Sequence, residues 1–170
     1  MLNYLPPIKS RDAFTGFALL LSLGTALALY YALLDTSLLN GVNRWTASTS
    51  GWALQGLGSG VTVNGTVVGS QDFAYRVVAE CTAIGPAVLF VAAIAAYPAS
   101  LRAKLIGLFG GLAAITALNL VRMISLFYIG AYFPQYLDMA HLLIWQGVMI
   151  LSVVILWLFW AQRWGQARQP

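Results

Sequence analysis

The chain has 170 residues and a net charge of +4, with 60% apolar and only 8% charged residues. A soluble domain carries about 25% charged residues, so this composition excludes an ordinary soluble protein and predicts an integral membrane protein. The basic residues stand in small groups beside apolar runs, which is typical of membrane topology signals and excludes a basic stripe for nucleic acid. The length suits one membrane domain over residues 1–170. A single cysteine excludes an internal disulfide framework and a CxxC pair.

The first apolar run covers residues 13–34 without a charge, which is long enough for a membrane helix of about 20 residues. Lys9 and Arg11 precede it, and basic residues before an apolar run also occur in cleaved signal peptides. The run exceeds the roughly 7–15 apolar residues of a signal peptide, and no small-x-small cleavage site follows it. We therefore expect an uncleaved membrane helix here.

The segment 35–79 is the only extensive polar part of the chain. Leu38, Val42 and Trp45 are spaced at i, i+4 and i+7, which predicts a short amphipathic helix at the membrane surface. The Ser, Thr and Gly residues at 46–51 should end this helix. The Asn-Gly pair at 64–65 lies between β-branched residues and predicts a hairpin with a two-residue type I′ turn. We therefore expect a folded cap made of a helix and a hairpin.

Three more apolar runs predict membrane helices over residues 80–97, 105–129 and 141–161, and Pro98 closes the first of them. Together with the helix at 13–34 they give the predicted fold. We expect an all-α integral membrane protein, a four-helix transmembrane bundle with a small extracytoplasmic helix-plus-β-hairpin cap over 35–79.

The basic residues also predict the orientation of the bundle, because cytoplasmic loops carry an excess of Lys and Arg. With an even number of helices, three basic groups fall on one side of the membrane: Lys9 and Arg11, Arg102 and Lys104, and Arg163 and Arg168. That side is expected to be the cytoplasm. Both termini are then cytoplasmic, and the cap faces the exterior.

In this topology three reactive side chains reach one membrane level. Cys81 lies at the outer start of the second helix and His141 at the outer start of the fourth. Arg122 follows Lys104 by eighteen residues. This is about 27 Å along the helix, close to the outer boundary of a hydrocarbon layer about 30 Å thick. Taken singly, the three have ordinary explanations as a small buried hydrophobe, an interfacial residue and a snorkelling arginine. Their shared level instead predicts an active site.

The three residue types match the needs of cysteine catalysis. The thiolate of Cys81 is the attacking species, and a helix N-terminus and a nearby cation both favour it. His141 takes the proton and later returns it to a leaving amine. Arg122 offers fixed donors where an oxyanion develops on a substrate carbonyl.

Three further polar residues have supporting roles in this prediction. Asn119 lies one helical turn before Arg122, and we expect it to hold the guanidinium or to bind the substrate backbone. Asp138 either caps the last helix or orients the imidazole of His141. Glu80 is expected to face water or a basic partner, because a carboxylate beside the thiol would oppose its ionisation. A single His and a single Cys with dispersed carboxylates lack zinc spacing, so we expect no metal and no cofactor.

These motifs resemble the exosortase/archaeosortase family. The run Glu80-Cys81-Thr82-Ala83-Ile84 opens one helix, Asn119-Leu120-Val121-Arg122 lies late in the next, and His141 opens the one after. The similarity covers residues 61–147, includes the Asn-Gly hairpin, and is to the compact bacterial subtypes, such as the exosortase H type. Many members have Cys-Ser-Gly or Cys-Ala-Gly, whereas Thr82-Ala83 follows the cysteine here. This departure concerns local geometry and substrate preference.

The resemblance implies a polytopic membrane cysteine transpeptidase, with Cys81 as nucleophile, His141 as acid and base, and Arg122 as transition-state stabiliser. It implies membrane-anchored exported proteins as substrates, each with a C-terminal recognition motif, one transmembrane helix and a basic tail. Cleavage would occur at the outer face of the bacterial inner membrane through a Cys81 acyl-enzyme, followed by transfer or release.

Two other classes remain open from the residues alone. A non-enzymatic membrane assembly factor or small transporter subunit would require a polar path across the whole bilayer, whereas the polar residues here gather at one side. A thiol redox protein would require a partner cysteine from another chain.

Overall fold

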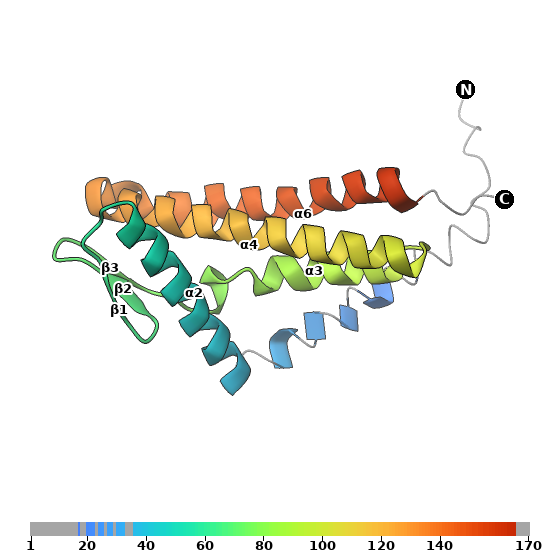
Figure 1. Cartoon of the computed structure of the whole chain (residues 1–170), viewed down its shortest axis with the longest axis horizontal. Coiled ribbons are helices and arrows are strands. Elements are labelled where there is room, and N and C mark those ends of the chain that lie inside the picture. The colour runs from blue at the N-terminus through green and yellow to red at the C-terminus, as the bar shows by residue number, and fades with distance from the viewer. Residues whose placement is uncertain are drawn as a thin grey trace, which may run out of the picture.

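A computed structural model describes residues 36–165 and, before them, residues 17, 20–22, 24, 25, 27, 28 and 30–32. The described residues before position 33 are helical and largely exposed. The rest of the run 13–34, and with it the choice between a membrane helix and a signal peptide, lies outside the described residues. Beyond position 36 the chain folds into helices and one small antiparallel sheet (Figure 1).

The cap begins with helix α2, Ser37–Gly56. Its buried side chains recur every three or four residues, as expected for one face of a helix, and they include Asn43, Thr46 and Ser50. Leu38, Trp45 and Trp52 are exposed on the other side, and their contact with a membrane surface stays a prediction. It does not end at residues 46–51. The hydroxyl of Thr49 donates to the carbonyl of Trp45, and that of Ser50 donates to the carbonyl of Ala47. These side chains therefore bond within the helix and do not terminate it.

The cap sheet has three antiparallel strands in the order β1 (Thr62–Asn64), β2 (Val67–Gly69) and β3 (Ala74–Arg76). The predicted hairpin is present, but its turn lies one residue later than expected. Asn64 pairs with Val67, so Gly65 and Thr66 form the turn, and only Gly65 has a positive φ, at 63°. A type I′ turn requires positive φ at both central residues, whereas type II′ places Gly at the first. The type I′ prediction is therefore wrong, and the third strand was not predicted.

Three helices form the bundle: α3 (Ile84–Ala96), α4 (Leu101–Tyr132) and α6 (Gln146–Trp160). They pack pairwise against one another (Figure 1). Four short pieces flank α6: the 3₁₀ turn Pro134–Tyr136, α5 (Leu137–Met139) and the π-helical turns Ala140–Trp145 and Ala161–Gly165. Within the described part, Leu101–Tyr132 and Pro134–Trp164 are long and apolar enough to cross a membrane.

Helix α3 starts later than the predicted residue 80, and its thirteen residues make it shorter than a full membrane span. The position of Pro86 explains the late start. Pro86 is the third residue of α3, where a backbone N–H would have no partner in the helix anyway. In a helix that began at residue 80, the same proline would occupy the interior and remove a backbone hydrogen bond.

Glycines bring the bundle helices into close contact. A Cβ on Gly107 would collide with the ring of Trp160, and one on Gly111 would collide with the ring of Phe90. Their i, i+4 spacing is the small-residue pattern of close helix packing in membranes. The indole N–H of Trp160 also donates to the carbonyl of Ala103 at 2.8 Å, in the buried interface. The sequence of α4 therefore fixes how α3 and α6 pack against it.

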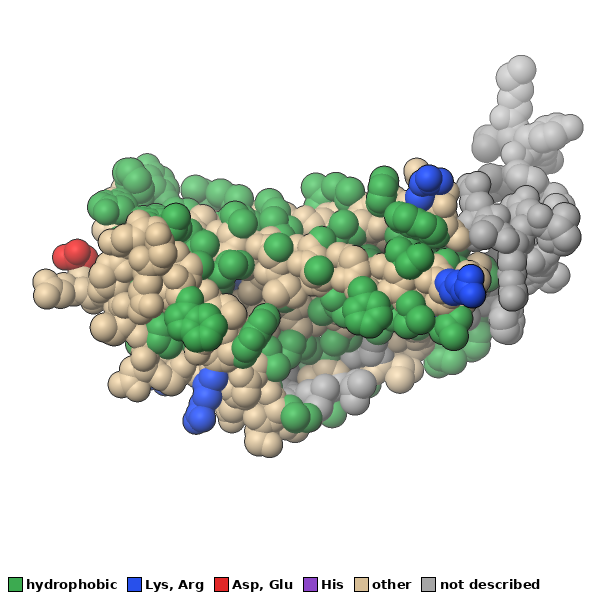
Figure 2. Space-filling view, viewed as in Figure 1, with side chains coloured by type: hydrophobic (Ala, Val, Ile, Leu, Met, Phe, Trp, Pro, Cys, Tyr) green, Lys and Arg blue, Asp and Glu red, His purple; other side chains and the backbone are tan. Residues whose placement is uncertain are grey.

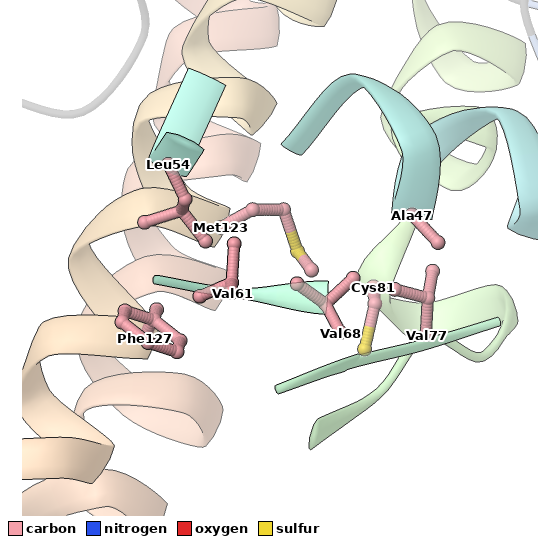
Figure 3. Close-up of a cluster of buried hydrophobic side chains, with 8 residues drawn as sticks. All are labelled: Ala47, Leu54, Val61, Val68, Val77, Cys81, Met123 and Phe127. Carbon is pink, nitrogen blue, oxygen red and sulfur yellow. The ribbon is translucent and has the colours of Figure 1, made fainter. Parts of the chain in front are cut away.

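The cap lies on one end of the bundle, the end where α4 finishes and the run Pro134–Trp164 begins (Figure 1). Its core joins α2, the sheet, the cysteine turn and α4 in one buried cluster: Ala47, Leu54, Val61, Val68, Val77, Cys81, Met123 and Phe127 (Figure 3). Figure 2 shows hydrophobic side chains along the bundle, Lys and Arg side chains at the end far from the cap, and a further basic side chain on the cap side.

Candidate active site

Cys81 is the last residue of a short 3₁₀ turn, Ala79–Cys81, and not the first residue of a helix. Its N–H donates to the carbonyl of Val78 at 2.9 Å, and its own carbonyl accepts a hydrogen bond from Asn119 Nδ2 at 3.1 Å. The side chain is only 9% exposed and packs in the cap core near Val68 and Val77 (Figure 3). The backbone of the cysteine is thus held by α4, while its thiol lies under the cap.

Thr82 closes the cysteine turn and prepares the start of α3. It is almost fully buried, its hydroxyl donates to the carbonyl of Ala79 at 2.7 Å, and the same oxygen accepts the N–H of Ile84 at 3.4 Å. Ile84 is the first residue of α3, where backbone N–H groups lack partners within the helix. The threonine that departs from the family pattern therefore supplies a hydrogen bond at this helix start.

Asn119 and Arg122 both project from the buried face of α4, and they are 4% and 2% exposed. Asn119 binds the Cys81 carbonyl and makes no hydrogen bond to the guanidinium in the described part of the chain. Among the described residues, its Oδ1 has no partner, and neither has Nε of Arg122. Buried polar groups normally have partners, because an unpaired one costs about 1–3 kcal/mol. Both groups therefore retain unused hydrogen-bonding capacity.

His141 lies in the π-helical turn Ala140–Trp145, at the start of the last helix. Its side chain is half-buried, and its Nε2 is enclosed and has no hydrogen-bond partner among the residues that the structure describes. Single π-helical turns inside helices often occur at functional sites. Asp138, one turn earlier, is exposed within α5 and makes no cap hydrogen bond, since the residue before α5 is Tyr136.

The predicted site residues interact through their charges. The guanidinium of Arg122 lies near enough to act on the charge of a Cys81 thiolate, and it also lies near enough to act on a protonated His141. Asp138 and Glu80 also act on the imidazole from exposed positions. In the part of the chain that is described, no hydrogen bond joins Cys81 Sγ to Arg122 or His141. The fold brings the predicted residues into one region without direct contact among the three catalytic candidates.

Tyr75 is a neighbour of the thiol that sequence reasoning missed. It lies on β3, and its hydroxyl donates to Ser50 Oγ on α2 at 3.2 Å. Burial raises the pKa of Tyr75, the hydrogen bond to Ser50 opposes this rise, and the negative charge of a Cys81 thiolate adds to it. Tyr75 is therefore a neutral donor near the sulfur. No residue pattern had predicted β3, so nothing in the sequence placed this hydroxyl.

These features define the class: a helical membrane protein in which a buried cysteine, a buried arginine and a half-buried histidine lie at the capped end of the bundle. A family model described as transmembrane exosortase matches residues 11–164. The chain therefore belongs to the transmembrane exosortase family, as the motifs around Cys81, Arg122 and His141 had indicated. No curated protein and no solved structure matches it.

Proposed function

We propose that this protein is a membrane-embedded cysteine transpeptidase or protease that cleaves the C-terminal sorting signal of membrane-anchored exported proteins. Family membership supports the reaction class. The observation that carries the proposal for this chain is the state of Arg122. Its guanidinium is buried, and in the described part of the chain its Nε has no hydrogen-bond partner. A fixed, unpaired donor in the same region as a thiol is suited to bind the oxyanion that forms when the thiolate attacks a carbonyl.

The reaction proceeds in two steps. In the first, His141 accepts the Cys81 proton, the sulfur bonds to the scissile carbonyl carbon, and Arg122 stabilises the resulting oxyanion. The carbon–nitrogen bond then breaks, the leaving amine takes the proton from His141, and a thioester remains on Cys81. In the second step an amine acceptor or water attacks the thioester and restores the thiol. Asn119 positions the Cys81 backbone throughout.

The resting thiol lies under the cap, so catalysis also requires a rearrangement. Catalytic hydrogen bonds are often long or unformed without substrate and tighten in the complex. Entry of a substrate segment beneath the cap would displace the cap strands and expose the sulfur to His141. The cap strands are short and contact the bundle mainly through apolar side chains, which is compatible with such a shift.

We further propose that the chain is a single multi-pass membrane domain with four membrane helices. Two of the four are Leu101–Tyr132 and Pro134–Trp164. The third is α3 together with the turn before it, and the fourth is the apolar segment 13–34. Arg102, Lys104 and Arg163 lie at the end of the bundle far from the cap, which supports a cytoplasmic position for that end. The site then faces the exterior of the bacterial inner membrane.

The test is co-expression with a tagged target that has a C-terminal motif, one transmembrane helix and a basic tail. The wild-type protein should shorten the target, Cys81→Ala should leave it intact, and Ser152→Ala, a remote change on α6, should behave as wild type. A thioester between Cys81 and the target, trapped and identified by mass spectrometry, would establish the intermediate. Normal processing by Cys81→Ala would refute the nucleophile assignment.

A further inference from the structure

A cavity of about 640 Å³ lies between the inner side of α2, the first turn of α3 and one face of α4. Ala83 and Ile84, which follow the cysteine turn directly, form part of its wall. Asn119 lines it from α4, and Thr46 and Thr49 line it from α2. The catalytic scheme above does not use this cavity, although it adjoins the loop that carries Cys81.

The two ends of the cavity differ in chemistry. Thr46, which is 6% exposed, and the buried amide of Asn119 supply polar groups from opposite walls near the cysteine loop. Asn119 Nδ2 already binds the Cys81 carbonyl, whereas Oδ1 has no partner in the part of the chain that the structure describes. An acceptor buried in this way is satisfied by a ligand that brings an N–H or O–H donor. The cavity therefore has a hydrogen-bonding end beside the proposed nucleophile.

The other end is apolar and reaches into the membrane-spanning part of α4. The wall on this helix extends from Phe109 to Met123, which corresponds to about 21 Å along the helix axis. Phe109, Leu112 and Ala113 form its lower part. A ligand that fills the cavity is thus polar at the level of the cysteine loop and apolar toward the bilayer interior.

We propose that this cavity is a lateral entrance that binds the substrate where its extended cleavage motif joins its transmembrane helix. This inference rests on the proposed function. The α2 wall from Val42 to Ser50 is about 12 Å long, enough for roughly four extended residues at about 3.3 Å each. The N–H groups of such a segment match Asn119 Oδ1, and the helix that follows matches the apolar wall. A lipid acyl chain would leave Oδ1 without a donor, which favours a polypeptide.

Two tryptophans of α2 provide a matched crosslinking test. Trp45 lines the cavity and Trp52 does not, although both are exposed on the same helix. A photoreactive benzoylphenylalanine replaces each in turn in the Cys81→Ala protein, which is co-expressed with the tagged target. Position 45 should crosslink to the target at the motif–helix junction, at least about tenfold more than position 52. Adducts at position 45 with lipid alone, or equal target adducts at both positions, would overturn the inference.

The polar end of the cavity is tested by measuring the kinetics of the intact enzyme in proteoliposomes. Thr46→Val should raise KM about 3- to 10-fold with little change in kcat, the range expected for one lost hydrogen bond. Thr62→Val, on the exposed edge of the sheet, should leave both constants unchanged. An unchanged KM in Thr46→Val would contradict the binding role. These results are separable from the proposed function, whose own failure would appear as processing of the target by Cys81→Ala.

Discussion

Asn119 Nδ2 donates a 3.1 Å hydrogen bond to the carbonyl oxygen of Cys81, linking residues that are 38 positions apart in the chain. This bond ties the cysteine turn to the middle of a membrane helix. It orients the backbone of Cys81, the proposed nucleophile, while the thiol itself is placed by the apolar core of the cap. A change in the packing of the cap can therefore shift the sulfur while the hydrogen bond from Asn119 to the Cys81 carbonyl is kept.

Replacing Asn119 with Leu removes this anchor and leaves the Cys81 carbonyl unpaired in a buried position. We expect the free energy of unfolding to fall by about 1–3 kcal/mol, as for other unsatisfied buried groups, and processing to fall at least about tenfold. Thermal unfolding in detergent and processing of a tagged target measure the two effects. Asn40→Leu, at an exposed position of α2, is the control. Normal processing by the Asn119→Leu protein would contradict the proposal that Asn119 positions Cys81.

Arg122→Lys keeps the positive charge but replaces a planar group that has several donors with a single ammonium. We expect a loss of about 100-fold or more in kcat/KM, comparable to the loss of one oxyanion donor in other enzymes. Arg44→Lys on the exposed side of α2 is the matched control. If the Arg122→Lys protein folds and turns over at a near-normal rate, Arg122 has a structural role only.

Gly111 and its neighbour Gly110 allow a direct test of the helix packing. A Cβ at Gly111 would collide with Phe90, whereas one at Gly110 meets nothing within 4 Å. Gly111→Ala should lower the free energy of unfolding by about 1–3 kcal/mol through overpacking. Gly110→Ala should be neutral or slightly stabilising, because alanine favours helix more than glycine does. Thermal unfolding of both proteins in the same detergent measures the difference, and equal stabilities would contradict the packing.

Tyr75 gives the cap a sensitivity to alkaline pH. Because burial raises the pKa of Tyr75 above its ordinary value of 10.0, the folded state favours the neutral phenol. The associated stability is present below pH 10 and is lost as the pH rises through the folded-state pKa. Above pH 10, Tyr75→Phe should therefore lose less stability than the wild type, when unfolding is followed by near-ultraviolet circular dichroism. Tyr136→Phe, at an exposed site, should follow the wild type.

The proposed orientation is tested with single cysteines in the Cys81→Ala protein. Gln71→Cys in the exposed loop of the cap should react with a membrane-impermeant maleimide added to intact spheroplasts. Arg102→Cys at the far end of the bundle should react only after permeabilisation. The reverse pattern would place the cap, and with it the candidate site, in the cytoplasm.

Much of the bundle could be predicted because long apolar runs have few alternatives to membrane helices. The residues at which the helices begin were predicted less accurately, although the sequence carries local signals for them. The side chain of Ser100 accepts the N–H of Ala103 and caps α4, which therefore starts at Leu101 and not at 105. Pro86 likewise marked the first turn of α3. The predicted starts of these helices followed the limits of the apolar runs and not these local signals.

The details of the site depended on tertiary contacts that no local pattern contains. β3 forms because Phe73 and Tyr75 pack against Phe127 of α4, more than fifty residues away. The regular rise of a helix let the sequence predict one membrane level for Cys81, Arg122 and His141, and this level stays a prediction. The sequence could not predict that Asn119 binds the Cys81 backbone or that a cavity lies beside the loop, because both depend on how α2 sits over α4.

The burial of the single thiol also bears on its chemical survival. Outside the cytoplasm, peroxides and foreign thiols convert accessible cysteines to sulfenic acids or mixed disulfides. With only 9% of Cys81 exposed, such reagents reach the sulfur slowly while the cap is closed. Under the proposed function, the apolar cover that hides the sulfur until a target arrives would also shield it against oxidative inactivation for the rest of the protein's lifetime.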